Sequence, residues 1–246
     1  MKPELSIVIP AYNESERLGV PLRKIFPYLA ANRPNSEVIV VDDGSSDDTA
    51  QVAEQAFAQF PSIASRIVKY EANRGKGFAV KTGLENAAAD IALFSDADLS
   101  TPIEETTKLV DPIASGEYDV TFGSRALDRS LIGTHQPWRR EQGGKVMNLI
   151  IRKMSGLNFA DTQCGFKAFN MLKFRPLLEM MTIDRFGFDV EFLFVAQHNG
   201  LRLAEIPVHW NDVAGSKVSA FRDARRMVTE LRQIRRNGRQ GLYDNK

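Results

Sequence analysis

Residues 91–100 have the sequence IALFSDADLS. The apolar run Ile91–Phe94 is typical of a strand that is covered on both faces, as in a parallel sheet. It leads into two carboxylates, Asp96 and Asp98, which repel each other unless a cation or hydrogen-bond donors join them. Mg²⁺ prefers oxygen ligands and is often held by one or two carboxylates together with substrate phosphates. The stretch therefore predicts a buried strand that ends at a divalent-metal site.

Four further short runs rich in Val, Ile and aromatic residues are predicted to be strands: Leu5–Pro10, Val38–Val41, Arg66–Tyr70 and Val120–Phe122. Helical patterns alternate with these runs, and they begin near Ser15, after Ser46, over Gly77–Ala88 and at Pro102. Such alternation is typical of βαβ units with right-handed crossovers. We therefore expect the α/β class, with a doubly wound, mostly parallel sheet and helices on both faces. Ligands of such sheets bind at the carboxyl ends of the strands.

Polar segments follow most of the predicted strands at that edge of the sheet: Pro10–Glu14, Asp42–Ser45, Asp96–Ser100 and Gly123–Arg125. Any strand must end at polar residues. The alternative is therefore that these segments are ordinary surface loops without a binding role. Carboxylates or arginine at four of the five ends favour a site. The segment 73–77, with the sequence NRGKG, precedes a predicted helix N-terminus, where backbone N–H groups attract anions. This segment lacks the spacing of a P-loop, which would indicate nucleotide hydrolysis. It also lacks the GxGxxG spacing of dinucleotide-binding enzymes, which would indicate hydride transfer.

The second half of the chain is less regular. We expect a helix with a broad apolar face over Gly144–Ser155, a strand over Leu201–Trp210 and a basic amphipathic helix over Phe221–Arg236. Residues 1–120 carry 11 basic and 19 acidic side chains (net −8), and residues 121–246 carry 21 and 12 (net +9). The basic half is therefore expected to bind an anionic partner, such as a phosphate group, a lipid surface or a nucleic acid. No repeat or linker divides residues 1–246, which predicts one domain.

Composition excludes several classes of protein. With 43% hydrophobic and 26% charged residues, the chain is an ordinary globular protein rather than a disordered or fibrous one. One cysteine, Cys164, excludes an internal disulfide and a Cys-based zinc site, and the three histidines are scattered. No apolar run approaches the ~20 residues of a membrane helix, and the N-terminus lacks a signal-peptide pattern. We therefore expect a cytoplasmic protein that does not span a membrane.

The motifs together resemble a known family over nearly the whole chain. Pro10–Glu14, Val41–Asp47 and Ser95–Asp98 are similar to the motifs of family 2 glycosyltransferases, which have the A-type glycosyltransferase fold. Further motifs resemble the dolichyl-phosphate β-glucosyltransferases, with the mannose synthases as relatives: Asp161–Lys167, Phe188–Glu191, Glu205–Val208 and 215–217. The resemblance implies a metal-dependent, inverting transfer of glucose from UDP-glucose to a polyprenyl (dolichyl) phosphate at the cytosolic membrane face. It also implies Mg²⁺ or Mn²⁺ as cofactor, a nucleotide-sugar half at 1–120 and an acceptor- and membrane-facing half at 121–246.

The resemblance also implies roles for individual residues. Those expected at the nucleotide sugar are Pro10, Ala11, Tyr12, Glu14, Asp42, Asp43, Lys76, Asp96 and Ala97. Asp96 and Asp98 are the expected metal ligands and, with Arg125 and Lys217, the expected catalytic set. Residues expected at the acceptor phosphate are Arg125, Arg139, Arg140 and Lys217, and those expected around the sugar are Gln163, Asp189 and Glu191. A structural alternative for Asp189 and Glu191 is a helix cap or an ion pair with Lys167.

The expected partners are a nucleotide-sugar donor, a polyprenyl-phosphate acceptor and a peripheral membrane surface contacted by Gly144–Ser155 and Phe221–Arg236. A phosphate acceptor is already anionic at neutral pH, so this reaction needs no strong general base. Three alternatives remain open: a GDP-mannose-dependent mannose synthase, a transferase to a saccharide acceptor, and a non-catalytic nucleotide-binding module. A nucleic-acid binder is disfavoured because no aromatic stacking platform accompanies the arginine-rich tail.

Overall fold

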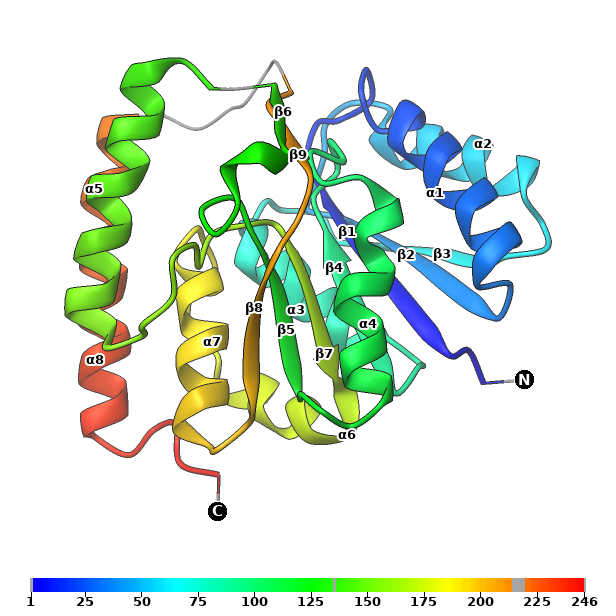
Figure 1. The fold of residues 1–246 in the computed structure, drawn as a ribbon. Helices are drawn as coiled ribbons and strands as arrows, with labels where there is room; N and C mark the ends of the chain where they lie inside the picture. Colours follow the sequence, from blue (N-terminus) through cyan, green and yellow to red (C-terminus); the bar gives the residue numbers. More distant parts are fainter. Residues whose placement is uncertain (1, 135, 214–219, 246) are drawn as a thin grey trace.

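The computed structural model describes residues 2–134, 136–213 and 220–245. Its centre is a seven-stranded sheet with the order β3-β2-β1-β4-β7-β5-β8 (Figure 1). The strands are β1 (Leu5–Ala11), β2 (Ser36–Asp42), β3 (Ala64–Lys69), β4 (Ile91–Ser95), β5 (Val120–Ser124), β7 (Phe166–Asn170) and β8 (Leu203–Pro207). All neighbouring pairs are parallel except that β7 runs antiparallel to both β4 and β5. The predicted fold class, a mostly parallel α/β sheet, is confirmed.

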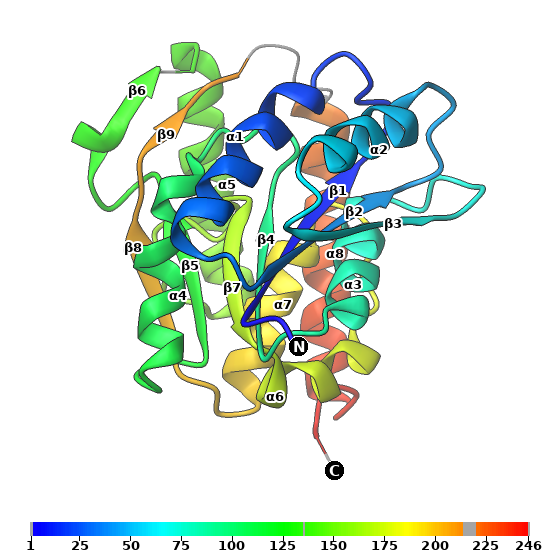
Figure 2. The same ribbon diagram turned by 90° about the vertical axis from the view of Figure 1, so that its right-hand side faces the viewer.

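Helices cover both faces of the sheet (Figures 1 and 2). One face packs against α1 (Gly19–Asn32), α2 (Thr49–Gln59) and α4 (Thr106–Ala114), which follows the short 3-10 helix Ile103–Glu105. The other face packs against α3 (Lys76–Asn86), α6 (Met171–Phe174), the 3-10 helix Arg175–Met180 and α7 (Phe188–His198). Beyond α7, the long helices α5 (Trp138–Ser155) and α8 (Ala220–Arg239) lie side by side at one edge of the molecule.

The apolar runs of the sequence form strands because both faces of the sheet are buried. Along β1, Ile7 and Ile9 enter the core beneath α1, α2 and α4, whereas Val8 enters the core beneath α3 and α7. Side chains alternate between the two faces of a strand, so a strand covered on both sides is apolar at most of its positions. This arrangement leaves the polar residues of the motifs at the carboxyl ends of the strands.

Several boundaries differ from the predicted ones. The helix expected near Ser15 begins at Gly19, because Glu14 first accepts backbone hydrogen bonds from Arg17 and Leu18 in a turn. The strand expected over 201–210 is two strands, β8 and the short β9 (Trp210–Asn211). Strand β9 pairs in parallel with β6 (Ile132–Thr134), which follows the 3-10 helix Arg129–Leu131. Strand β7 and helix α7 were not predicted.

Strand β7 lacks a continuous apolar pattern because Lys167 lies in its middle, although that side chain is fully buried. The helices expected at 144–155 and 221–236 are present in longer form as α5 and α8. Among the helices that the structure describes, none combines the length and the apolar character needed to cross a bilayer.

Candidate active site

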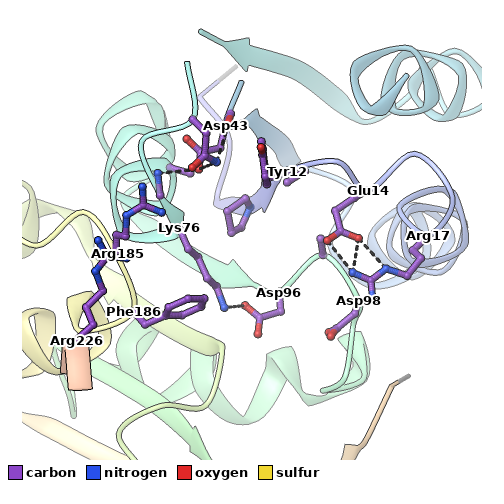
Figure 3. Close-up of a pocket in the computed structure, with 16 residues that line it drawn as sticks. Tyr12, Glu14, Arg17, Asp43, Lys76, Asp96, Asp98, Arg185, Phe186 and Arg226 are labelled. Carbon is purple, nitrogen blue, oxygen red and sulfur yellow. Dashed lines mark hydrogen bonds and ion pairs between the residues drawn. The ribbon is translucent and has the colours of Figure 1, made fainter. Parts of the chain in front are cut away.

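The carboxyl ends of β1, β2 and β4 open into a cavity of about 590 Å³, here called the first cavity (Figure 3). Nine of the residues predicted from the sequence line it: Pro10, Ala11, Tyr12, Glu14, Asp43, Lys76, Asp96, Ala97 and Asp98. They come from four separate loops, which the parallel arrangement of the strands brings to one edge of the sheet. The structure therefore assembles most of the predicted nucleotide-sugar residues in one place.

Asp96 and Asp98 occupy a tight turn directly after β4. The backbone N–H of Leu99 donates to the carbonyl oxygen of Asp96, and Asp98 Oδ1 accepts a hydrogen bond from the Ser100 N–H at 3.0 Å. Leu99 has φ +51°, a left-handed conformation that costs a non-glycine residue about 1–2 kcal/mol. Such strain is concentrated at functional sites, where it holds side chains in a required direction.

The carboxylate of Asp96 lies between two neighbours. On one side it packs against Gly165, where a Cβ atom would lie 2.1 Å from Asp96 Oδ2, so a larger residue at 165 would displace this carboxylate. On the other side the Nζ atom of Lys76 lies 2.5 Å from Asp96 Oδ1. Burial lowers the pKa of Lys76, but the carboxylates of Asp96 and Asp189 outweigh this effect and raise it, so Lys76 is an ammonium ion at neutral pH.

The oxygen atoms of Asp96 and Asp98 fit a hard divalent cation, since both carboxylates line the same cavity and neither is fully buried. Within the described part of the chain, no group of three or more His, Cys, Asp or Glu side chains is arranged to hold a metal. A cation at this pair would therefore take its remaining ligands from water and from a bound phosphate, as Mg²⁺ usually does.

Asp43 shapes the wall of the first cavity. Its carboxylate accepts four hydrogen bonds, from the Tyr70 hydroxyl (2.7 Å), Asn73 Nδ2 (2.8 Å) and the backbone N–H groups of Arg74 (2.8 Å) and Gly75 (2.9 Å). These bonds hold the loop before α3 against the end of β2. The contact with the nucleoside that was expected for Asp43 stays a prediction.

Asp42 does not line the first cavity. Its side chain is fully buried, with Oδ1 accepting from the Ser45 N–H at 2.8 Å and Oδ2 lying 3.4 Å from Lys69 Nζ. These contacts close the turn after β2. Asp42 therefore closes that turn in the structure, and its expected contact with the nucleotide sugar stays a prediction.

The sequence analysis missed several residues of this cavity, among them Arg17, Arg185, Phe186 and Arg226. Arg17 pairs with Glu14 at 2.7 Å on one side of the cavity, and Arg185 and Arg226 lie on the opposite side, with the Lys76–Asp96 pair between them (Figure 3). Glu14 and Arg17 carry opposite charges and are three residues apart in the sequence. This spacing is the local signal from which their ion pair could have been predicted. Arg185 and Arg226 come from the loop before α7 and from α8, which no local pattern connects to β1 or β4.

A second cavity of about 500 Å³ lies between α5, the loop after β5 and the paired strands β6 and β9, which contribute Ile132 and Trp210. Of the predicted residues, Arg125, Arg140 and Gln163 line it. The structure adds three basic side chains that were not predicted there: Arg129, Lys145 and Arg152. With two carboxylates among its lining residues, Glu141 and Asp161, this cavity is strongly cationic. It is suited to a ligand with more than one negative charge.

Both carboxylates of the second cavity are ion-paired with arginine. Asp161 Oδ2 lies 2.6 Å from Arg125 Nε, and Glu141 Oε2 lies 2.8 Å from Arg129 Nη2. Burial raises the pKa of Asp161, but Arg125 outweighs it and holds this pKa at about 2. Burial lowers the pKa of Arg125, and Asp161 and Asp96 together raise it above its usual value. Gln163 lines the second cavity and Gly165 packs against Asp96 of the first, so the segment 163–165 links the two cavities.

Asp189 and Glu191 are buried rather than exposed to a cavity. Asp189 Oδ1 lies 2.5 Å from Lys167 Nζ, which also donates to the carbonyl oxygen of Cys164. Glu191 accepts hydrogen bonds from the backbone N–H groups of Thr182 and Ile183 and from the Tyr243 hydroxyl. The structure thus favours the structural alternative for both residues, and the ion pair expected between Asp189 and Lys167 is present.

Two predicted acceptor residues are not placed. Lys217 lies outside the described residues, and so does the side chain of Arg139, whose backbone belongs to α5. Their expected contacts with a phosphate group stay predictions.

Comparisons with known proteins agree with this geometry. Residues 6–177 match the family Glycosyl transferase family 2. Human dolichyl-phosphate β-glucosyltransferase is 32% identical over 243 residues, which cover 94% of this chain and 75% of the relative. A dolichyl-phosphate β-glucosyltransferase of Trichomonas vaginalis is 35% identical over 249 residues, which cover 97% and 72%.

Solved structures share the fold. Glucosyl-3-phosphoglycerate synthase from Mycobacterium tuberculosis, in complex with Mn²⁺, UDP and glucosyl-3-phosphoglycerate, superposes with a TM-score of 0.70 at 20% identity, covering 94% of this chain and 80% of that chain. A mannosyltransferase from Pyrobaculum calidifontis, in complex with GDP-mannose and Mn²⁺, gives a TM-score of 0.62 at 19% identity, covering 100% and 66%. The predicted A-type glycosyltransferase fold is thereby confirmed. The chain belongs to glycosyl transferase family 2 and is a glycosyltransferase similar to the dolichyl-phosphate β-glucosyltransferases.

Proposed function

We propose that this enzyme transfers glucose from UDP-glucose to a polyprenyl phosphate such as dolichyl phosphate, with inversion at the anomeric carbon. One observation carries the choice of acceptor: both carboxylates of the second cavity, Glu141 and Asp161, are ion-paired with arginine. A saccharide hydroxyl must lose a proton to a general base as it attacks, and a carboxylate with a pKa of about 2 is a poor base at neutral pH. A phosphate oxygen needs no such base.

The first cavity is the proposed site of the nucleotide sugar. Its walls offer Tyr12 and Phe186 as apolar surfaces, and Lys76, Arg185 and Arg226 as cations that attract the diphosphate. Asp96 and Asp98 would hold the divalent cation, as their shared position in this cavity supports. When bound there, Mg²⁺ or Mn²⁺ would neutralise the negative charge that develops on the leaving UDP. The complexes of two structural relatives with Mn²⁺ and a nucleotide support this part of the proposal.

The second cavity is the proposed site of the acceptor phosphate. Arg125 is held at its inner end by Asp161, and the segment 163–165 leads from there to Asp96. The acceptor phosphate and the nucleotide diphosphate repel each other, and the arginines between the two cavities reduce that repulsion. The chain itself thus orients the phosphate oxygen towards the sugar and lowers the cost of bringing two anions together.

A membrane surface is the proposed source of the acceptor. Helix α5, which forms one wall of the second cavity, exposes three large apolar side chains, Trp138 (72% exposed), Val146 (60%) and Leu149 (66%). Next to it, α8 carries four exposed arginines at 232, 235, 236 and 239. Each basic residue near an anionic leaflet contributes about 1 kcal/mol to binding. We therefore place α5 and the arginines of α8 against the bilayer, at the cytosolic face.

The direct test is transfer from a panel of nucleotide sugars. The purified protein is incubated with UDP-glucose or GDP-mannose and with a polyprenyl phosphate or a saccharide, in Mg²⁺, Mn²⁺ or chelator. We expect glucosylated polyprenyl phosphate from UDP-glucose in either metal and none in chelator. Transfer to the saccharide alone would overturn the assigned acceptor, and use of GDP-mannose alone would overturn the assigned nucleotide sugar.

Membrane contact is tested separately by flotation with vesicles. We expect the protein to float with vesicles containing an anionic phospholipid at low salt and to be released at high salt, since exposed charges are screened there. Replacing Leu149 with Ser should weaken flotation, whereas replacing the exposed Leu172 on α6 with Ser should not. A protein that ignores anionic vesicles at low salt would contradict this orientation.

A further inference from the structure

We propose that the ammonium group of Lys76 occupies the place of the divalent cation on Asp96 in the free protein, and that the diphosphate of the nucleotide releases it. Lys76 would thus act as a built-in competitor that makes metal binding depend on nucleotide binding. This inference rests on the proposed nucleotide-sugar site and adds a regulation of that site.

The first step is the position of the ammonium group. Lys76 Nζ lies 2.5 Å from Asp96 Oδ1, and a Mg²⁺ ion bound to the same oxygen would lie about 2.1 Å from it. On its other side the carboxylate packs against Gly165, where a Cβ atom would lie 2.1 Å from Oδ2 and 2.3 Å from Oδ1, so the side open to the first cavity is the one that Lys76 occupies. Lys76 and a cation therefore compete for one side of Asp96.

The second step concerns the movement that releases Asp96. The backbone of Lys76 is held in place by its glycine neighbours, which approach the loop before α7 closely. A Cβ atom at Gly75 would lie 2.5 Å from the Asp184 carbonyl oxygen, and one at Gly77 would lie 2.6 Å from that of Ile183. The end of the Lys76 side chain, in contrast, borders the open space of the first cavity. The side chain therefore moves while its backbone stays.

The third step asks what anion receives the displaced ammonium group. Asp189 is one candidate, because its partner Lys167 and Lys76 both lie beside the Phe94 ring. It is already paired with the fully buried Lys167 at 2.5 Å, and the Nζ atoms of Lys76 and Lys167 both lie 5.6 Å from the centre of the Phe94 ring. A move of Lys76 to Asp189 would place two ammonium groups on one carboxylate.

The diphosphate of a nucleotide in the first cavity is thus the partner that Lys76 lacks once a cation binds. If a metal ion binds alone, the ammonium group of Lys76 is left unpaired beside a divalent ion. If a nucleoside diphosphate binds with the metal ion, the diphosphate pairs with both the metal ion and the ammonium group of Lys76. The two ligands should therefore bind with positive coupling, and the coupling must be reciprocal.

The test measures Mn²⁺ binding to the free protein by isothermal titration calorimetry, with and without UDP. In the natural protein we expect weak binding of Mn²⁺ alone and much tighter binding with UDP. In Lys76→Met and Lys76→Gln we expect Mn²⁺ alone to bind about tenfold tighter, with the enhancement by UDP reduced. Lys76→Arg keeps a cation beside Asp96 and should retain weak binding of Mn²⁺ alone.

Lys69→Met is the matched control. Lys69 also pairs with a buried aspartate at a strand end, Asp42, but it lies outside the first cavity, so its loss should leave both binding constants unchanged. The alternative is that Lys76 only supports the position of Asp96. In that case Lys76→Met and Lys76→Gln will bind Mn²⁺ alone no tighter than the natural protein does, and this result would show the inference to be wrong. If the natural protein binds neither Mn²⁺ nor UDP, the proposed function itself is wrong as well.

Discussion

Arg125 and Asp161 are joined at three points, although 36 residues separate them. The Nε and Nη2 atoms of Arg125 lie 2.6 Å and 2.9 Å from the two carboxylate oxygens of Asp161, and the Arg125 backbone N–H donates to the same carboxylate at 3.1 Å. Asp161 is held in turn by Glu205, whose Oε1 accepts from its backbone N–H at 2.7 Å. Glu205, Asp161 and Arg125 therefore form a rigid support for the inner end of the second cavity.

Replacing Asp161 with Asn should impair use of the acceptor more than use of the nucleotide sugar. The guanidinium of Arg125 loses a charge-assisted partner worth about 1.5–3 kcal/mol, so we expect the KM for polyprenyl phosphate to rise about tenfold or more. The KM for UDP-glucose should change less than about twofold. Steady-state kinetics with each substrate varied in turn measures both values.

Asp111→Asn is the control for this variant, since Asp111 forms a similar ion pair with Arg33 at 2.6 Å but lies on the surface outside both cavities. It should leave both KM values unchanged. An equal rise of the two KM values in Asp161→Asn would show that Arg125 does not act mainly on the acceptor.

The stability of the protein should depend on the charge of Asp161 in acid. The pKa of Asp161 is about 2 in the folded protein, below its unfolded value of about 3.9, so its stabilisation is present above pH 4 and is lost as the pH falls towards 2. The shift corresponds to about 2.5 kcal/mol. Urea unfolding should therefore show Asp161→Asn to be less stable at pH 7, with the difference from the natural protein shrinking between pH 4 and pH 2. A difference independent of pH would contradict the assigned pKa.

Replacing Lys167 with Met should destabilise the fold strongly. This change leaves Asp189 buried without its cation, which typically costs about 3–5 kcal/mol. The double variant Lys167→Met with Asp189→Leu removes both charges, so urea unfolding should show most of the stability restored. If the double variant is as unstable as the single one, the pair does more than neutralise charge.

Replacing Tyr243 with Phe should weaken the attachment of the C-terminal segment. The buried Tyr243 hydroxyl lies 2.6 Å from Glu191 Oε1 and accepts a hydrogen bond from Asn237 Nδ2 at 3.1 Å. Its loss leaves buried polar groups with fewer partners, and we expect a loss of about 1–3 kcal/mol in urea unfolding. Tyr28→Phe, whose hydroxyl makes an exposed contact with Thr107, should change stability by less than about 0.5 kcal/mol.

Replacing Asp96 or Asp98 with Asn should abolish metal-dependent transfer. The proposed cation contributes several kcal/mol to the reaction, so we expect a loss of at least about 100-fold in kcat. Asp128→Asn is the control, because Asp128 caps an exposed turn near the second cavity without lining it. Activity that persists in chelator, or in either variant, would contradict the assignment of the metal site.

The amino-acid sequence alone determined most strands of the sheet, though not β7, and the edge at which the chemistry lies. Apolar runs such as Ile91–Phe94 predict strands because both faces of this sheet are covered, and the polar motifs after them must meet at one edge. Asp96 and Asp98 were predicted at this edge in this way, whereas the resemblance to the family assigned Lys76 to the nucleotide. These inferences hold because strand pattern and strand ends are properties of a few neighbouring residues.

Only the tertiary structure decided which side chains face the cavities and which are buried in hydrogen bonds and ion pairs within the protein. Asp189 and Glu191 belong to a motif of the family, yet both are buried in hydrogen bonds and ion pairs. Arg185 and Arg226 enter the first cavity from segments far along the chain. Whether a carboxylate is free or paired depends on partners that lie 20 to 100 residues away in the sequence and that folding brings close. The spacing of neighbouring residues cannot reveal such partners.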